Sequence, residues 1–205
     1  MTEQRIILAS ASPRRRELLT RAGIDFDVRE SPLPEPDRPP RTVSPRAWAE
    51  SVAYFKARAV AEGHRGRTIL AADTIVECGG DVLGKPLDAA DAERMLRLQA
   101  GRVSEVITGV AVLCLPRAAA HKPFEATRII RHEVTYVRMG DDDALIREYV
   151  ASGDWAGKAG AYGIQNIGDR LIERIDGDFD NVVGLPVALV MRLLRNFSAG
   201  CSGDC

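Results

Sequence analysis

The chain has few of the features that mark zinc-binding, membrane-spanning or nucleic-acid-binding proteins. Its 205 residues include only 4 cysteines, and the cysteine positions show no paired metal-ligand spacing, so a zinc site is not indicated. The longest apolar runs, around 110–115 and 182–191, are shorter than the ~20 residues of a membrane span. The chain has 28 basic and 29 acidic residues, so the basic excess typical of nucleic-acid binders is also missing. We therefore expect no membrane and no nucleic-acid partner.

The first residues also lack a recognisable export signal. Residues 6–9 are the whole apolar run before Ser10, which is too short for the apolar part of a secretory signal. We therefore expect a cytoplasmic protein in a reducing compartment. The length favours one domain, because domains commonly have roughly 150 residues. We expect a single domain over residues 1–197 and a disordered tail over 198–205.

What the chain does contain is an alternation of strand and helix signals. Residues 5–9 form a short apolar run typical of a buried strand, and Ser12 and Pro13 then fit the cap and the first position of a helix. Ser44 and Pro45 repeat this pattern before a longer helix. The apolar positions of the second helix recur every three or four residues, and they are Trp48, Val52, Phe55 and Ala59.

The remaining segments complete a mixed architecture. Further strands are predicted at 26–29, 68–76, 103–115, 124–137 and 171–175, and further helices at 88–99, 141–150 and 185–197. Asp88 is the expected cap of the helix at 88–99, and the glycine pair at 79–80 indicates a turn. Strands alternate with helices early in the chain and a strand pair lies in its middle, so we predict an α/β fold around a mixed sheet. Residues 31–41 are rich in proline and are interpreted as an ordered loop or lid, and 176–180 as a turn with solvated carboxylates.

The turn at 10–16 has the composition of an anion site. Small residues lead from a strand to a helix N-terminus, where free backbone N–H groups and the helix dipole favour a negative charge. Arg14 and Arg15 add fork-shaped donors that suit phosphate oxygens. The alternative is a well-capped surface helix whose arginines are solvated.

Asp73 is unusual because it lies within an apolar run, 70–76. Burying an unpaired carboxylate is costly, so we expect Asp73 either at the end of a strand or facing a wet cleft with a cation. Lys85 lies across a predicted hairpin from it, between a glycine and a proline that would restrict the direction of its side chain. The alternatives are a turn-capping aspartate and a solvated lysine.

The segment 157–165 interleaves glycines with Lys158, Tyr162 and Gln165. Such a composition indicates backbone wrapped closely around a ligand, and the alternative is a flexible loop. The amide of Gln165 supplies one donor group and one acceptor, which suits the edge of a nucleobase.

Taken together, these segments resemble the Maf family of nucleoside triphosphate pyrophosphatases. The matching stretches follow one another along nearly the whole chain, at 8–15, 72–76, 83–86, 158–165 and 181–186. The resemblance implies metal-dependent hydrolysis of a nucleoside triphosphate to its monophosphate and diphosphate. It also implies a Maf/ITPase-like fold, which is an elongated mixed β-sheet flanked by helices, with two lobes around a deep cleft, and often a homodimer.

The resemblance also implies roles for individual residues. Asp73 matches the proton acceptor of the family, and Lys85 joins it as a second catalytic candidate on the phosphate side. The expected substrate-binding and specificity residues are Ser10, Arg14, Arg15, Lys56, Thr74 and Gln165.

The cofactor that the resemblance implies is a divalent cation, Mg²⁺ or Mn²⁺. A triphosphate carries about four negative charges, and hard cations with carboxylate ligands are the expected counter-charge. The expected metal residues are Asp73 and Glu35. Glu30 is the alternative to Glu35, because the prolines of 31–41 leave the register open.

The sequence of the segment 158–165 is similar to that found in the branch of the family that acts on dTTP and UTP. Uracil and thymine share an N3–H donor and an O4 acceptor, which a single amide at Gln165 can satisfy. Two other functions stay open from the sequence. One is the same reaction on another or modified nucleotide, such as 7-methyl-GTP. The other is a nucleotide-binding regulator of cell division without turnover.

Overall fold

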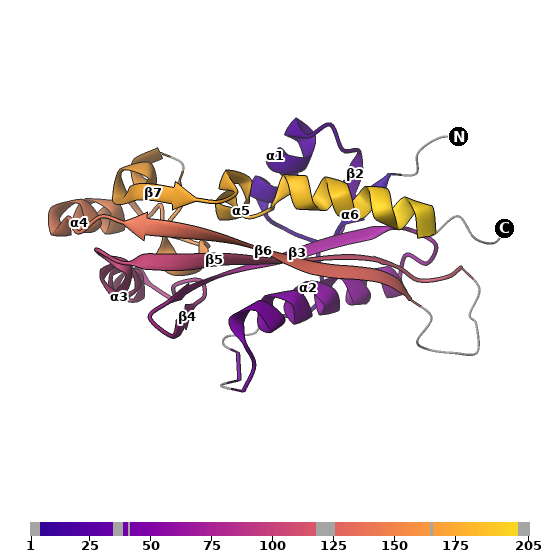
Figure 1. The fold of residues 1–205 in the computed structure, drawn as a ribbon, viewed down its shortest axis with the longest axis horizontal. Helices are drawn as coiled ribbons and strands as arrows, with labels where there is room; N and C mark the ends of the chain where they lie inside the picture. The colour runs from indigo at the N-terminus through magenta and orange to yellow at the C-terminus, as the bar shows by residue number, and fades with distance from the viewer. Residues whose placement is uncertain (1–4, 35–38, 41, 118–125, 165, 201–205) are drawn as a thin grey trace.

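A computed structural model describes residues 5–34, 39–40, 42–117, 126–164 and 166–200. Within these residues the chain forms an elongated α/β structure built on one seven-stranded mixed sheet (Figure 1). The predicted fold class is therefore confirmed. In this described part, none of the helices has the length and apolar character required to cross a bilayer.

The sheet combines parallel and antiparallel pairing. Its strands are β1 (Ile6–Leu8), β2 (Phe26–Val28), β3 (Ile69–Cys78), β4 (Asp81–Leu83), β5 (Val103–Cys114), β6 (Thr127–Met139) and β7 (Ile172–Asp176). They lie in the order β2-β1-β3-β5-β6-β7, and β4 pairs with β3 beside this path. β1 is parallel to β2 and β3, whereas the pairs formed by β3, β4, β5, β6 and β7 are antiparallel.

Helices cover both faces of this sheet. They are α1 (Pro13–Arg21), α2 (Pro45–Glu62), α3 (Ala89–Gln99), α4 (Asp143–Ser152), α5 (Phe179–Val183) and α6 (Val187–Gly200), with short 3₁₀ turns η1 (Ala159–Ala161) and η2 (Asn166–Leu171). α2 lies on one face, and α1, α5 and α6 lie on the other, while α3 and α4 lie together at one end of the molecule (Figure 1).

Local sequence explains where the helices begin. The side chains of Ser12, Ser44 and Asp88 each accept a hydrogen bond from the backbone N–H three residues later, which satisfies a donor that the helix itself leaves unpaired. All three predicted caps are confirmed. Asp178 caps α5 in the same way, at a place where the sequence predicted a plain turn.

The last helix is longer than expected. α6 continues to Gly200, beyond residue 197, where we expected a disordered tail to begin. Residues 201–205 lie outside the described residues. The assignment of residues 1–197 to a single domain stays a prediction.

The buried face of α2 also differs from the prediction. Phe55 was expected on that face, but it is 57% exposed. The face consists mostly of small residues with a lysine among them, and its members are Ala49, Val52, Ala53, Lys56, Ala57, Val60 and Ala61. The reason lies in β5, because a Cβ atom at Gly109 would lie 2.2 Å from the carbonyl oxygen of Ala49. The helix backbone thus approaches the sheet so closely that only small side chains fit between them.

The middle of β3 has an open edge. On one side β5 pairs with β3 from Ile69 to Glu77. On the other side β1 pairs with Ile69 and Leu70, and β4 pairs with the stretch from Val76 to Cys78. Among the described strands none pairs with 71–75 on this second side, and the sheet therefore has a gap between β1 and β4.

Candidate functional site

A cavity of about 1000 Å³ opens beside this gap. Its walls come from the turn before α1, from α2 and β3, from the turn after β4 and the first half of α3, from the Gly-rich segment and from the connection between α5 and α6. Seven of the residues that the sequence predicted for the site line it, namely Ser10, Arg14, Arg15, Lys56, Asp73, Thr74 and Lys85. The other two, Glu35 and Gln165, lie outside the described residues.

Asp73 lies in the middle of β3 and faces α2. The ammonium group of Lys56 donates a hydrogen bond to Asp73 Oδ1 over 2.7 Å, and the two side chains are 10% and 15% exposed. Of the two predicted placements, the structure therefore shows the cleft with a cation and not the end of a strand. A partly buried carboxylate with a hydrogen-bonded cation avoids the cost of an unpaired charge.

Gly109 is the residue that allows this pairing. It lies directly opposite Asp73 in the β3–β5 register, and it is where the backbone of α2 comes closest to the sheet. Lys56 follows Ala49 by two helical turns and so lies on the same face of α2. The close approach at Gly109 thus places the lysine over the neighbouring strand.

Thr74 points to the opposite face of the sheet, because successive side chains of a strand alternate. Its hydroxyl lies 2.9 Å from the hydroxyl of Thr108 on β5. Arg15 donates to the same oxygen from Nη2 at 3.1 Å, and the carbonyl of Gly184 lies 3.4 Å away. The adjacent residues Asp73 and Thr74 therefore belong to two different hydrogen-bonded groups.

The start of α1 borders the cavity as the sequence predicted. Ser10 is buried, and its hydroxyl accepts a hydrogen bond from the backbone N–H of Ser12 at 3.2 Å. Arg14 donates from Nη2 to the carbonyl of Gly157 at 3.2 Å, which ties α1 to the Gly-rich segment. Burial lowers the pKa of the Arg14 guanidinium from its ordinary value.

Lys158 adds a second cation at this end of the cavity. Burial is the main cause that lowers the pKa of its ammonium group; the charge of Asp154 opposes this shift and the nearby charge of Arg14 adds to it. The ammonium group donates to the backbone carbonyl of Asp154. Two partly desolvated cations that line one cavity favour the binding of an anion there.

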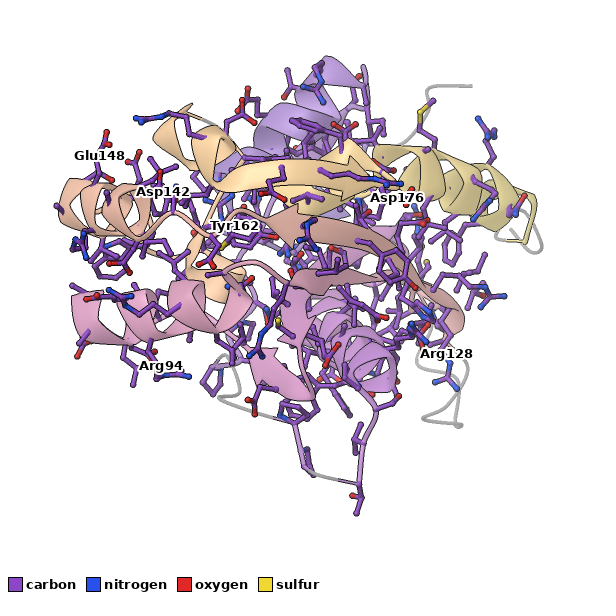
Figure 2. The ribbon with its side chains drawn as sticks, turned by 60° about the vertical axis from the view of Figure 1, so that its left-hand side comes forward. Arg94, Arg128, Asp142, Glu148, Tyr162 and Asp176 are labelled. Carbon is purple, nitrogen blue, oxygen red and sulfur yellow. The ribbon has the colours of Figure 1, made fainter. Side chains whose placement is uncertain are left out.

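The Gly-rich segment is held by two backbone contacts. The N–H of Gly160 donates to the carbonyl of Gly84 at 3.0 Å. Gly84 is the residue before Lys85. The carbonyl of Gly160 accepts from the buried amide of Gln99 on α3 at 2.8 Å. Tyr162 lies in the interior, whereas Arg94 projects from α3 (Figure 2). The segment is thus an ordered wall of the cavity over its described residues, and the alternative of a flexible loop is not supported.

The carboxylates available for a metal ion are few. Glu30, Asp73 and Asp91 line the cavity, but among the described residues no group of three or more acidic, histidine or cysteine side chains could together hold an ion. Mg²⁺ is commonly bound by one or two carboxylates together with substrate phosphates and water. The donor set therefore fits a cation that is bound jointly with a phosphate chain, with Asp73 as one ligand.

Sequence reasoning missed several residues that shape the site. Gly109, Gln99 and Lys158 were not predicted as site residues, because they act through contacts between segments that are distant in the chain. The resemblance had included Lys158 in a matching stretch, and its charge beside glycines was a usable signal. Gly109 lay within a predicted apolar strand, where an isolated glycine indicates a close backbone approach.

Comparison with known proteins finds a matching family model and similar proteins along nearly the whole chain. Residues 5–197 match the family model described as "Maf-like protein". A dTTP/UTP pyrophosphatase of Deinococcus radiodurans is 42% identical over 98% of this chain and 97% of that protein. Proteins of the same name from Moorella thermoacetica and Geobacter sulfurreducens are 45% and 44% identical, each over 97% of this chain and over 98% and 100% of the relative. Among solved structures, that of the Staphylococcus aureus Ham1 protein is similar over 96% of this chain and 99% of the Ham1 chain, with a TM-score of 0.49 and 16% sequence identity.

Proposed function

Since this chain belongs to the Maf family, we propose that it hydrolyses dTTP and UTP to dTMP or UMP and diphosphate. One observation carries the proposal: a single cavity is lined by the carboxylate of Asp73 and by the cationic side chains of Arg14, Lys56 and Lys85. The names of relatives at 42–45% identity over nearly their full length support this choice of substrate.

Asp73 is the proposed proton acceptor. Its carboxylate would take a proton from the water that attacks the phosphorus atom, and such a base contributes roughly 10²–10⁴-fold to a rate. Lys56 holds one carboxylate oxygen at 2.7 Å, which fixes the direction of the carboxylate. The other oxygen can then accept the proton from the water.

The cations of the cavity would neutralise the triphosphate. Lys85 and Arg14 come from segments that are far apart in the sequence, and they line the same space. Charge builds up on the leaving diphosphate, so donors that are already in position lower the barrier without having to reorganise. A bound Mg²⁺ or Mn²⁺ would supply further charge neutralisation of the phosphates, and we propose Asp73 together with Glu35 or Glu30 to hold it.

Gln165 is the proposed reader of the base, with Arg14 and Thr74 as further specificity residues. Its amide can donate to O4 and accept from N3–H, which uracil and thymine share. Exchange for glutamate removes the donor, so a Gln165→Glu variant should lose dTTP and UTP turnover selectively. An unchanged substrate profile would contradict this role.

The decisive experiment measures diphosphate release from a panel of nucleoside triphosphates with Mg²⁺ or Mn²⁺. We expect turnover of dTTP and UTP, and a loss of at least ~10²-fold in the Asp73→Asn variant. Asp142→Asn is the matched control, because asparagine also caps a helix and Asp142 begins α4, none of whose residues line the cavity. Its turnover should equal that of the unmodified protein.

The same panel separates the alternatives. Preferred cleavage of 7-methyl-GTP or another modified nucleotide would change the substrate but keep the reaction, and binding without cleavage would favour a regulator. A homodimer and a cytoplasmic location stay predictions, and the first can be checked by the mass of the protein in solution.

A further inference from the structure

Arg15 bridges the gap in the sheet with its guanidinium group. Nε donates to the carbonyl of Gly184 at 2.8 Å, and Nη1 donates to the carbonyl of Ala72 at 2.8 Å and to the hydroxyl of Ser10 at 3.3 Å. Nη2 donates to the hydroxyl of Thr74 at 3.1 Å. An arginine has five N–H donors, so at least four of those in Arg15 have acceptors within the protein.

These acceptors belong to three separate walls of the cavity. Ser10 comes from the turn before α1, Ala72 and Thr74 from β3, and Gly184 from the connection between α5 and α6. Ala72 lies on the open edge of β3, where none of the described strands pairs with it through backbone hydrogen bonds. Arg15 therefore gives this edge carbonyl its partner, as buried backbone groups require.

Arg15 also donates hydrogen bonds to both sequence neighbours of Asp73. One goes to the residue before it and one to the residue after it. The direction in which the carboxylate leaves the strand depends on the backbone at these two neighbours. A shift of either would move the carboxylate relative to Lys56, with which it shares a 2.7 Å hydrogen bond.

A buried polar network supports the other end of the bridge. The hydroxyl of Thr108 lies 2.9 Å from that of Thr74 and 3.5 Å from the carbonyl of Asn181. The side-chain amide of Asn181 donates to the backbone carbonyl of Val106 at 3.0 Å and to the hydroxyl of Thr135 at 3.1 Å. Since Thr108, Thr135 and Asn181 are completely buried, the segment that carries Gly184 is anchored to two strands of the sheet.

Arg14, the preceding residue, is arranged differently. It makes one hydrogen bond within the described part of the chain, to the carbonyl of Gly157 at 3.2 Å. Its remaining donors are available to a ligand in the cavity that it lines. Two adjacent arginines at the start of one helix thus differ in how many of their donors the protein itself uses.

We infer that Arg15 is a positioning residue, which fixes Ser10, Thr74 and the backbone around Asp73, and that Arg14 is the arginine that binds the triphosphate. This departs from the expectation that both arginines are substrate ligands. The inference rests on the proposed function, because it assigns the two residues to different parts of the same reaction.

The test compares Arg15→Met with Arg14→Met in UTP hydrolysis. A displacement of about 1 Å in a catalytic group can cost ~10²-fold in rate, so Arg15→Met should lower kcat by about that factor while KM changes less than about threefold. Arg14→Met should raise KM by about tenfold or more. Calorimetric binding of a UTP analogue with a methylene bridge between the α and β phosphorus atoms should follow KM in both variants. Weaker analogue binding in Arg15→Met, by tenfold or more and with kcat retained, would overturn the inference.

A second measurement tests whether Arg15 acts through Thr74. Thr108→Val removes the hydroxyl beneath Thr74 at nearly constant volume, and residues in one network show non-additive effects. We expect the double variant with Arg15→Met to lose much less in kcat than the product of the two single losses. Full additivity would contradict the inference. If Arg15→Met does not fold, Arg15→Lys, which keeps the positive charge but has a single donor nitrogen in place of three, takes its place in both measurements.

The outcomes also separate this inference from the proposed function. If the unmodified protein cleaves none of the nucleotides, the proposed function fails. The positioning role is then judged from the coupling between Arg15→Met and Thr108→Val in the free energy of unfolding by urea, together with analogue binding. Additive unfolding effects and a tenfold weaker analogue in Arg15→Met would reject it independently of turnover.

Discussion

Gly109 offers the sharpest test of how the fold positions the carboxylate of Asp73, the proposed proton acceptor. A Cβ atom at this position would lie 2.2 Å from the carbonyl oxygen of Ala49, 2.3 Å from its carbonyl carbon and 2.5 Å from the backbone nitrogen of Glu50. All three atoms belong to the backbone of α2, so no side chain can rotate away to relieve the clash. A Gly109→Ala variant must therefore move the helix or the strand.

The size of the effect follows from these distances. Carbon atoms in contact normally stay about 3.5 Å apart, so α2 has to retreat by about 1 Å. Overpacking of this kind costs about 1–3 kcal/mol of folding free energy. The same shift draws Lys56 away from Asp73, where the hydrogen bond is now 2.7 Å long. A misplacement of about 1 Å at a reacting group lowers a rate by ~10²-fold, and we expect a loss of that order in kcat for UTP.

Two assays on the same preparations check this expectation, namely urea unfolding and diphosphate release. Gly63→Ala is the matched control, because Gly63 ends α2 with a φ of −85° and the nearest atom to its Cβ would be 3.9 Å away. The control should stay within about 0.5 kcal/mol of the parent and keep its kcat. A Gly109→Ala protein with the stability and turnover of the parent would refute the reasoning that the approach of α2 sets the site.

Three further perturbations have outcomes that the structure determines. Lys56→Met removes the cation that directs Asp73, so diphosphate release should show a fall in kcat of at least ~10-fold with a smaller change in KM. Burial raises the pKa of Tyr149 to about 12, while an unfolded tyrosine ionises near 10; the unfolded state therefore loses its proton first, and stability falls between pH 10 and 12. Tyr149→Phe should remove this part of the alkaline loss in urea unfolding measured across that range. Exchanging Asp73 and Thr74 for one another should abolish turnover with the circular dichroism of the parent retained, because the carboxylate would then face Arg15 instead of Lys56.

Local signals in the sequence predicted the element starts well. Ser12, Ser44 and Asp88 were identified as helix caps, and each accepts the expected backbone hydrogen bond. Capping depends on residues within one helical turn, so the sequence alone contains the information. The same holds for the hairpin of β3 and β4, where a glycine pair marks the turn at 79–80.

The orientation of α2 was not predictable in this way. Periodicity placed Phe55 inward because it is large and apolar, yet it is 57% exposed, while Lys56 is buried. What decides the orientation is the clearance between the helix and β5, which Gly109 sets. That distance depends on a residue more than fifty positions along the chain, and tertiary contacts override local preference.

Seven of the nine residues predicted for the site line the cavity, but the contacts among them were not predictable from the sequence. The resemblance supplied Lys56, which no local pattern distinguishes from other lysines on a helix surface. The chemistry of a carboxylate in an apolar run indicated a cationic partner for Asp73, without saying which. Arg15 was predicted to bind phosphate, and the sequence held no sign that its donors would meet four acceptors of the protein itself.

The dipeptide of Asp73 and Thr74 shows why the site needs an interrupted sheet. Adjacent strand residues point to opposite faces, so one strand can present a carboxylate to α2 and a hydroxyl to Arg15 at the same level. If a neighbouring strand continued through the gap between β1 and β4, its backbone would take the carbonyl of Ala72 and exclude the guanidinium that now holds it. The gap therefore gives Arg15 access to the edge of β3. By holding this edge, Arg15 fixes the level at which Asp73 on one face and Thr74 on the other face border the same cavity.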